Sequence, residues 1–181
     1  MPIRFDLSKY KTSTFIETGT YSGEGIRKAL EAGFTDIRSI ELDPNMYTAN
    51  VEQFKNFPQV KIYHGDSALV LPQLLKEINY QCTFWLDAHY SGGPTQSGPV
   101  LSPIVDELKV IEQHSVKNHI LLIDDYRQFD YTGIDPETKK EWGFPGKLKL
   151  LDLIRQINPK YTITFIQGIQ VGDVVCATFD S

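Results

Sequence analysis

The sequence predicts an α/β protein: a mostly parallel β-sheet with helices on both faces and an antiparallel hairpin at its C-terminal end. Short apolar runs alternate with segments of helical periodicity, which is typical of βαβ units. The last two apolar runs have the pattern of a closing hairpin. With 181 residues, 41% of them hydrophobic, the chain has the size of one compact domain, which we expect to span residues 1–181.

Turn and capping residues separate the elements in the first half of the chain. Gly33 stands where a helix stops, and the Asp43-Pro44 pair suits the start of the next helix. The predicted strands of this half are 14–17, 37–42 and 60–64, and the predicted helices are 25–32 and 43–54.

The second half follows the same alternation. Ser67 suits the N-cap of a helix that extends to Ile78, and Pro72 should bend or shorten that helix. The Ser102-Pro103 pair, after a Gly/Ser/Pro-rich loop, predicts the cap and first turn of another helix. The predicted strands of this half are 82–86, 119–123, 161–166 and 171–179, and the predicted helices are 67–78, 104–111 and 148–157.

The charge balance argues against nucleic acid or a membrane surface as a partner. The chain has 18 Lys+Arg against 23 Asp+Glu, so its net charge is −5, whereas those partners require a basic face. No stretch has the apolar length of a membrane span, and the start lacks the apolar stretch of a signal peptide. Cys82 and Cys176 lie in apolar runs and are expected to be buried, reduced thiols, which suits a cytoplasmic protein.

A glycine-rich turn follows the first predicted strand, in the segment 17–25 with the sequence ETGTYSGEG. The spacing matches neither the dinucleotide motif G-x-G-x-x-G nor the phosphate-loop motif, so an ordinary βα turn is one interpretation. Glu17 and Glu24 place negative charge on both sides of the turn, which would repel a phosphate. Their charge instead favours a nucleotide-like cofactor with ammonium and sulfonium groups, which is S-adenosylmethionine.

Five motifs in order carry a family resemblance over residues 13–127: ETGTYSG, SIELDP, HGDS, FWLDAH and LLIDDY. Together they resemble the class I methyltransferases that use S-adenosylmethionine. More narrowly, they are similar to the metal-dependent O-methyltransferases, which include the catechol and antibiotic-sugar enzymes. The resemblance implies a Rossmann-like, seven-stranded, mostly parallel sheet whose last strand is antiparallel.

The resemblance also implies a set of cofactor contacts. Glu41, the acid that ends the second strand, would accept hydrogen bonds from both ribose hydroxyls. Asp43 is better explained as a helix N-cap, and Ser67 can be an adenine contact, an N-cap or both. The implied cofactor contacts are Glu17, Thr18, Gly19, Thr20, Tyr21, Ser22, Gly23, Glu41, Asp66, Ser67 and Asp87.

Three acids follow two neighbouring strands of the predicted sheet: Asp87, Asp124 and Asp125. Three close carboxylates repel one another unless a cation or protons intervene. In the resembling enzymes these positions bind a divalent metal ion, and a set of oxygen ligands favours Mg²⁺, with Mn²⁺ or Ca²⁺ as alternatives. Asp125 alone has a second interpretation, as a cap of the following turn.

The candidate catalytic residues are Asp87 and His89. A histidine beside a metal and a cofactor is a candidate base because its ordinary pKa lies near neutrality, although a lone histidine is more often structural. The catechol enzymes carry lysine three residues after the metal-binding aspartate, where this chain has Tyr90, so catechol is not the expected acceptor.

A long polar segment, 127–146, follows the last predicted parallel strand. We expect a lid or acceptor-recognition loop, because the segment is long for a βα connection. Arg127, Tyr131, Trp142 and Phe144 are candidate contacts, since aromatic rings with polar edges suit stacking on a sugar. A surface loop that packs its own aromatic residues is the alternative.

The sequence thus predicts a metal-dependent O-methyltransferase acting on a small-molecule or glycan acceptor, with a sugar hydroxyl as the target. One alternative is a glycosyltransferase that uses Asp87-Ala88-His89 as a D-x-H metal site for a sugar nucleotide, although the acidic turn would repel the diphosphate. Another is a non-catalytic binding module. The chain begins almost directly at its first strand, so one module of a longer polypeptide is also an expectation.

Overall fold

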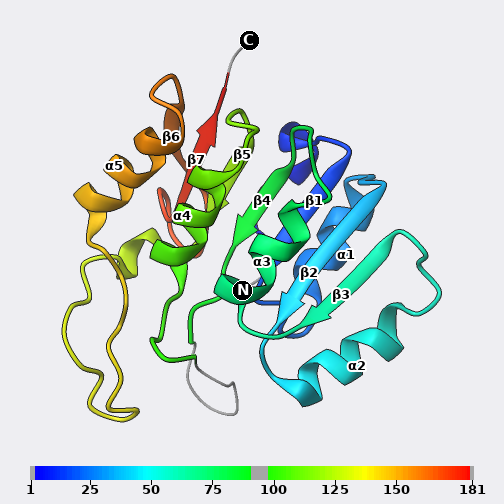
Figure 1. Ribbon diagram of the computed structural model, residues 1–181, viewed down its shortest axis with the longest axis horizontal. Coiled ribbons are helices and arrows are strands. Elements are labelled where there is room, and N and C mark those ends of the chain that lie inside the picture. The colour runs from blue at the N-terminus through cyan, green and yellow to red at the C-terminus, as the bar shows by residue number, and fades with distance from the viewer. Residues whose placement is uncertain (1–2, 91–97, 180–181) are drawn as a thin grey trace.

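The computed structural model describes residues 3–90 and 98–179. Its strands form one seven-stranded sheet in the order β3-β2-β1-β4-β5-β7-β6 (Figure 1). The pairs among β1 to β5 are parallel, and β7 is antiparallel to both β5 and β6. The strands are β1 (Thr14–Thr18), β2 (Asp36–Glu41), β3 (Val60–His64), β4 (Thr83–Leu86), β5 (Ile120–Ile123), β6 (Thr162–Ile166) and β7 (Val174–Thr178). This arrangement confirms the predicted fold class.

Helices cover both faces of the sheet, because the strands bury side chains alternately on its two sides. Phe15 and Trp85 pack in a core with residues of α1, α2 and the N-terminal segment. Ile16 and Phe84, their neighbours along the strands, pack on the other side against α3, α4 and α5, of which α3 and α4 lie in front of the sheet in Figure 1. The helices are α1 (Glu24–Glu31), α2 (Pro44–Phe54), α3 (Ser67–Leu75), α4 (Ile104–Gln113) and α5 (Lys147–Ile157), with the short 3-10 helices η1 (Leu7–Tyr10) and η2 (Tyr126–Gln128).

The register of the sheet brings the ends of its central strands to one edge. Thr18 pairs with Leu86, and Leu86 pairs with Ile123, so these three strands end at the same level. The residues that follow continue the pairing: the Asp87 amide donates to Thr18 (3.2 Å) and the Asp124 amide donates to Leu86 (3.2 Å). Because β7 is antiparallel to β5, β7 begins at this edge rather than ending there.

The helix starts include one confirmed prediction and two corrections. Asp43 caps α2 by accepting from two backbone amides, as expected. Ser67 does not cap α3: the cap is Asp66, whose carboxylate accepts from the Ala68 amide (2.9 Å). Ser102 does not cap α4 either, because the N-cap position is Pro103 and no side chain caps that helix.

Three further segments refine the expected boundaries. The helix α3 contains Pro72 and ends at Leu75 rather than Ile78. The strand β7 begins at Val174 rather than Val171, because Gly172 takes a left-handed φ of 78° in the turn before it. Residues 91–97 of the expected Gly/Ser/Pro-rich loop lie outside the described residues.

Two sequence expectations about burial and membrane spans can be compared with the structure. Cys82 and Cys176 are free, buried thiols, as predicted. Across residues 3–90 and 98–179, none of the helices combines the length and the apolar character that a membrane crossing needs.

Candidate active site

A cavity of about 880 Å³ opens at the carboxyl ends of the parallel strands. Its size lies within the range of small-molecule and cofactor sites, and its position is the usual ligand position in open α/β sheets. Thr18 and Gly23 do not line it, because Thr18 is buried and Gly23 packs against Phe54 and Asn50. The predicted cofactor contacts that line the cavity are Glu17, Gly19, Thr20, Tyr21, Ser22, Glu41, Asp66, Ser67 and Asp87.

The glycine turn depends on close approach as well as on backbone conformation. Gly19 has a φ of 84°, and a Cβ atom there would lie 2.5 Å from the backbone oxygen of Asp87. A Cβ atom on Gly25 would collide with the carboxylate of Glu17, which lies under the start of α1. Glycine at position 19 therefore lets the turn after β1 pass directly beside the end of β4, and glycine at position 25 lets α1 start against the Glu17 carboxylate.

Two buried carboxylates anchor the cofactor half of the cavity. Glu17 accepts a hydrogen bond from the Ser39 hydroxyl (2.6 Å), but burial dominates and raises the pKa of Glu17 to about 8. Glu41 accepts from the backbone amides of Tyr21 (2.7 Å) and Asp43 (2.8 Å), one on each carboxylate oxygen. A carboxylate accepts up to about four hydrogen bonds, so Glu41 retains capacity for a further donor such as a ribose hydroxyl.

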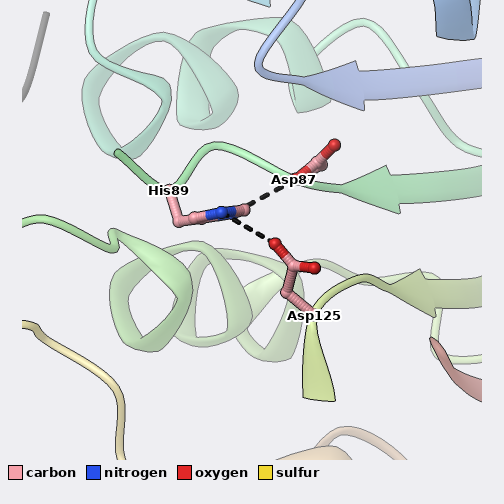
Figure 2. Close-up of side chains that lie close together, drawn as sticks. All are labelled: Asp87, His89 and Asp125. Carbon is pink, nitrogen blue, oxygen red and sulfur yellow. Dashed lines mark ion pairs between the residues drawn. The ribbon is translucent and has the colours of Figure 1, made fainter. Parts of the chain in front are cut away.

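The acid half of the site is centred on His89, which Figure 2 shows between Asp87 and Asp125. Its Nδ1 lies 3.2 Å from an Asp87 oxygen, and its Nε2 lies 2.7 Å from an Asp125 oxygen. Burial disfavours the charged imidazolium, but the hydrogen bonds and negative charges of Asp125 and Asp87 outweigh it and raise the pKa of His89 to about 10. In this arrangement His89 carries a proton on each ring nitrogen at neutral pH.

The three acids expected to bind a metal lie in two overlapping clusters of possible ligands. Their oxygens divide between two clusters that share Asp125: Asp87 and His89 belong to one, and Asp124 and Asp173 to the other. Burial, followed by the charges of Asp87 and Asp125, raises the pKa of Asp124 to about 7. Strand β7 is the reason for the second cluster, because it brings Asp173 beside the end of β5.

The residues of the two clusters fit a divalent cation. Four carboxylates, those of Asp87, Asp124, Asp125 and Asp173, face two cationic side chains, His89 and Arg127. Asp125 Oδ1 is in ion-pair contact with Arg127 but takes no hydrogen bond of good geometry from the described residues. The ligand atoms are hard oxygens together with one imidazole, a set that suits Mg²⁺ or Mn²⁺.

The cavity as a whole is negatively charged. No lysine or arginine lines it within the described part of the chain. Such a lining attracts a cationic ligand and repels a diphosphate, which counts against a sugar nucleotide. The acids that line the cavity are Glu17, Glu24, Glu41, Asp43, Asp66, Asp87 and Asp106.

Solved structures with the same architecture include methyltransferases. The O-methyltransferase TomG from Streptomyces achromogenes, in complex with SAM, superposes with a TM-score of 0.60 at 14% identity, over 97% of this chain and 76% of that one. An O-methyltransferase from Bacillus cereus in complex with SAH gives 0.60 at 15% identity, over 96% and 77%. The chain has the class I methyltransferase fold.

A further comparison concerns the acceptor atom. The N-methyltransferase NodS from Bradyrhizobium japonicum also superposes, with a TM-score of 0.56 at 10% identity over 97% of this chain and 90% of that one. The methyltransferase fold alone therefore does not select the acceptor atom. No protein-family model matches this chain, and no curated protein sequence does.

Two buried acids beside the site were not singled out from the sequence. Asp173 precedes the last strand, and its place beside Asp125 follows once that strand is known to be antiparallel. Glu107 lies on the buried face of α4, where burial outweighs nearby Ser67 and Thr18 hydroxyls and raises the pKa of Glu107 to about 7. A charged residue on the apolar face of a predicted helix was the signal for Glu107.

The loop between η2 and α5 packs its own aromatic residues. Trp142 lies edge-on to Tyr131 (5.5 Å between ring centroids) and stacks with Phe144 (6.4 Å). Phe144 in turn lies 6.3 Å from the His89 ring. The guanidinium of Arg127, a candidate acceptor contact, is instead paired with Asp125 and Asp173.

Proposed function

We propose that this chain is a metal-dependent O-methyltransferase that transfers the methyl group of S-adenosylmethionine to a hydroxyl group on a sugar of a glycan or glycoside. The observation that carries the proposal is an acid-lined cavity that meets a buried carboxylate cluster at the end of β4. The fold is shared with O-methyltransferases whose structures hold SAM or SAH.

The cofactor half accounts for binding and orientation. Glu41 accepts the ribose hydroxyls, while Asp66 and Ser67 border the space for the adenine. Glu17 and the Gly19 turn border the space for the methionine portion, whose positive charges match the acidic lining. The cofactor supplies the reactive methyl group, and the protein fixes the position and orientation of the cofactor at the edge of the sheet.

The acid half accounts for the acceptor and its proton. Asp87, Asp124 and Asp125 would hold the divalent ion. Asp87 and Asp125 lie in one cluster with His89, and Asp124 lies beside Asp125 in the other. When bound, that ion supplies positive charge that favours loss of the acceptor proton.

The proton acceptor is His89 or Asp87. Asp87 and Asp125 keep His89 protonated in the structure, and carboxylates engaged with a cation no longer favour that proton. With an ion bound, His89 would release one ring proton to solvent, and the freed nitrogen would accept the proton of the acceptor hydroxyl. Asp87 is the alternative base.

The acceptor class rests on the aromatic loop and on Tyr90. Tyr131, Trp142 and Phe144 form a series of rings that leads from the loop to His89. Aromatic faces of this kind stack on sugar rings. Tyr90, where the catechol enzymes carry lysine, supports a sugar over a catechol.

The test is transfer of labelled methyl from S-adenosylmethionine to a panel of rhamnosides, other glycosides and catechols. We expect transfer to a glycoside, loss of transfer with EDTA and recovery with Mg²⁺ or Mn²⁺. Transfer only to catechols contradicts the acceptor class. Full activity in metal-stripped protein shows that the acids have another purpose.

A further inference from the structure

Asp125 has an unusual backbone conformation for an aspartate in the centre of a protein. Its φ of 58° and ψ of 36° lie in the left-handed region, and its side chain is 1% exposed. A residue other than glycine persists there only when the surrounding contacts enforce the conformation. The contacts around Asp125 should therefore identify the groups that aim its carboxylate.

Part of the surroundings that fix Asp125 comes from Asp173, the residue before β7. The backbone oxygen of Asp173 accepts from the Tyr126 amide (2.8 Å), and its carboxylate accepts from the Arg127 amide (3.1 Å). The same carboxylate pairs with the Arg127 guanidinium, which also contacts Asp125 Oδ1. One buried aspartate thus fixes both the turn that follows Asp125 and the arginine that holds its side chain.

This geometry gives Asp173 a different part from the proposed metal ligands Asp87, Asp124 and Asp125. The cluster of Asp124, Asp125 and Asp173 already contains a cation, the Arg127 guanidinium. Asp173 is fully buried and its carboxylate is engaged with Arg127 on both oxygens. Asp125 Oδ2 accepts from the Gln128 side-chain amide (3.0 Å) and lies 2.7 Å from His89 Nε2, in the cluster that contains Asp87.

We propose that Arg127 and Asp173 are positioning residues for Asp125: Asp173 fixes Arg127, and Arg127 holds Asp125 so that its second oxygen faces Asp87 and the metal. The inference rests on the metal dependence of the proposed function. It gives the C-terminal antiparallel strand a part in the site, since Asp173, on which the orientation of Asp125 depends, directly precedes β7.

Metal binding without turnover provides the test. Mn²⁺ affinity is measured by electron paramagnetic resonance of the free ion for wild type, Arg127→Met, Arg127→Lys and Asp173→Asn. Arg155→Met, on the exposed side of α5, is the matched control. Thermal melting and metal-free binding of S-adenosylhomocysteine are measured for every variant.

Arg127→Met should weaken Mn²⁺ binding about 10- to 100-fold, as loss of groups that orient metal ligands does. Arg127→Lys should recover part of the affinity, because lysine keeps the charge without the fork that reaches two carboxylates. Asp173→Asn should also weaken Mn²⁺ binding, and S-adenosylhomocysteine affinity should stay at the wild-type value. If Arg127→Met fails to fold, the lysine and asparagine variants carry the comparison.

Two results overturn the inference and leave the proposed function standing. In one, Arg127→Met binds Mn²⁺ with the same affinity as Arg155→Met. In the other, Arg127→Met binds Mn²⁺ more tightly than wild type. The second result would mean that Arg127 competes with the metal for Asp125. Wild-type protein that binds no Mn²⁺ removes the metal from the proposed function, and the inference with it.

Discussion

The two halves of the site are built in different ways. In the cofactor half, the key carboxylate Glu41 is held by the backbone amides of Tyr21 and Asp43, within or just beyond the turns that follow β1 and β2. In the acid half, side chains hold side chains: His89 joins β4 to β5, and Arg127 joins β5 to β7. The first half is organised by backbone and the second by charge.

This difference predicts a separation of effects. Changes in the cofactor half should alter S-adenosylhomocysteine affinity, and changes in the acid half should alter metal binding and turnover. A residue whose substitution changes S-adenosylhomocysteine affinity and metal affinity equally would contradict this separation.

The largest effect is expected for His89→Ala. The substitution removes the proposed base and should lower turnover about 10²- to 10⁴-fold, while S-adenosylhomocysteine affinity stays unchanged. The measurement is methyl transfer to the acceptor found in the panel, with His64→Ala, an exposed histidine on β3, as the control. Undiminished turnover in His89→Ala would assign the base role to Asp87.

A smaller effect is expected in the cofactor half for Gly19→Ala. Its matched control is Gly133→Ala, because both glycines have a φ of 84° but only Gly133 has open space around the added Cβ. The displaced backbone in Gly19→Ala costs about 1 to 3 kcal/mol, so S-adenosylhomocysteine affinity should fall about 5- to 150-fold. Calorimetry that gives equal affinities for the two variants would show that close packing against Asp87 does not matter for the cofactor.

The smallest effect concerns Glu107, which lies between the two halves. Its folded pKa of about 7 lies above its ordinary value of 4.5, so its contribution to stability is complete below pH 4.5 and is lost as pH rises through 7. Glu107→Gln removes this pH-dependent loss of stability, because glutamine has no carboxyl group to ionise. Relative to wild type, the variant should gain on the order of 1 to 3 kcal/mol of unfolding free energy between pH 5 and pH 8.

Thermal and denaturant unfolding at both pH values measure this gain. Glu112→Gln, on the same helix, is the control and should show no pH-dependent difference. An equal difference for Glu107→Gln at pH 5 and pH 8 would show that the carboxyl group titrates normally.

The sequence was sufficient for the fold and for the backbone-organised half. Alternating strand and helix patterns predicted the sheet, and the glycines after β1 placed the turn that lines the cavity. Asp43 was correctly assigned as a cap because capping is local. Ser67 was wrongly assigned as a cap, because Asp66, one residue earlier, is an equally good acceptor and occupies the N-cap position.

The acid half was less accessible from sequence, for a physical reason. Asp87, Asp124 and Asp125 were expected to converge on one metal, and the structure adds Asp173, nearly fifty residues from Asp125 along the chain, to the same region. The raised pKa of His89 likewise depends on two acids from different strands. Strand register decides such contacts, and no local pattern reports it.

The central claim is that the acid-lined cavity binds S-adenosylmethionine. The most direct measurement is a calorimetric titration of S-adenosylhomocysteine into wild type, Glu41→Ala and the surface control Glu52→Ala, an exposed acid on α2. Removing a charged acceptor for two ribose hydroxyls costs about 1.5 to 3 kcal/mol, so Glu41→Ala should bind about 10- to 150-fold more weakly, and Glu52→Ala should match wild type. Wild-type protein that does not bind S-adenosylhomocysteine, or Glu41→Ala that binds it as wild type does, would contradict the account.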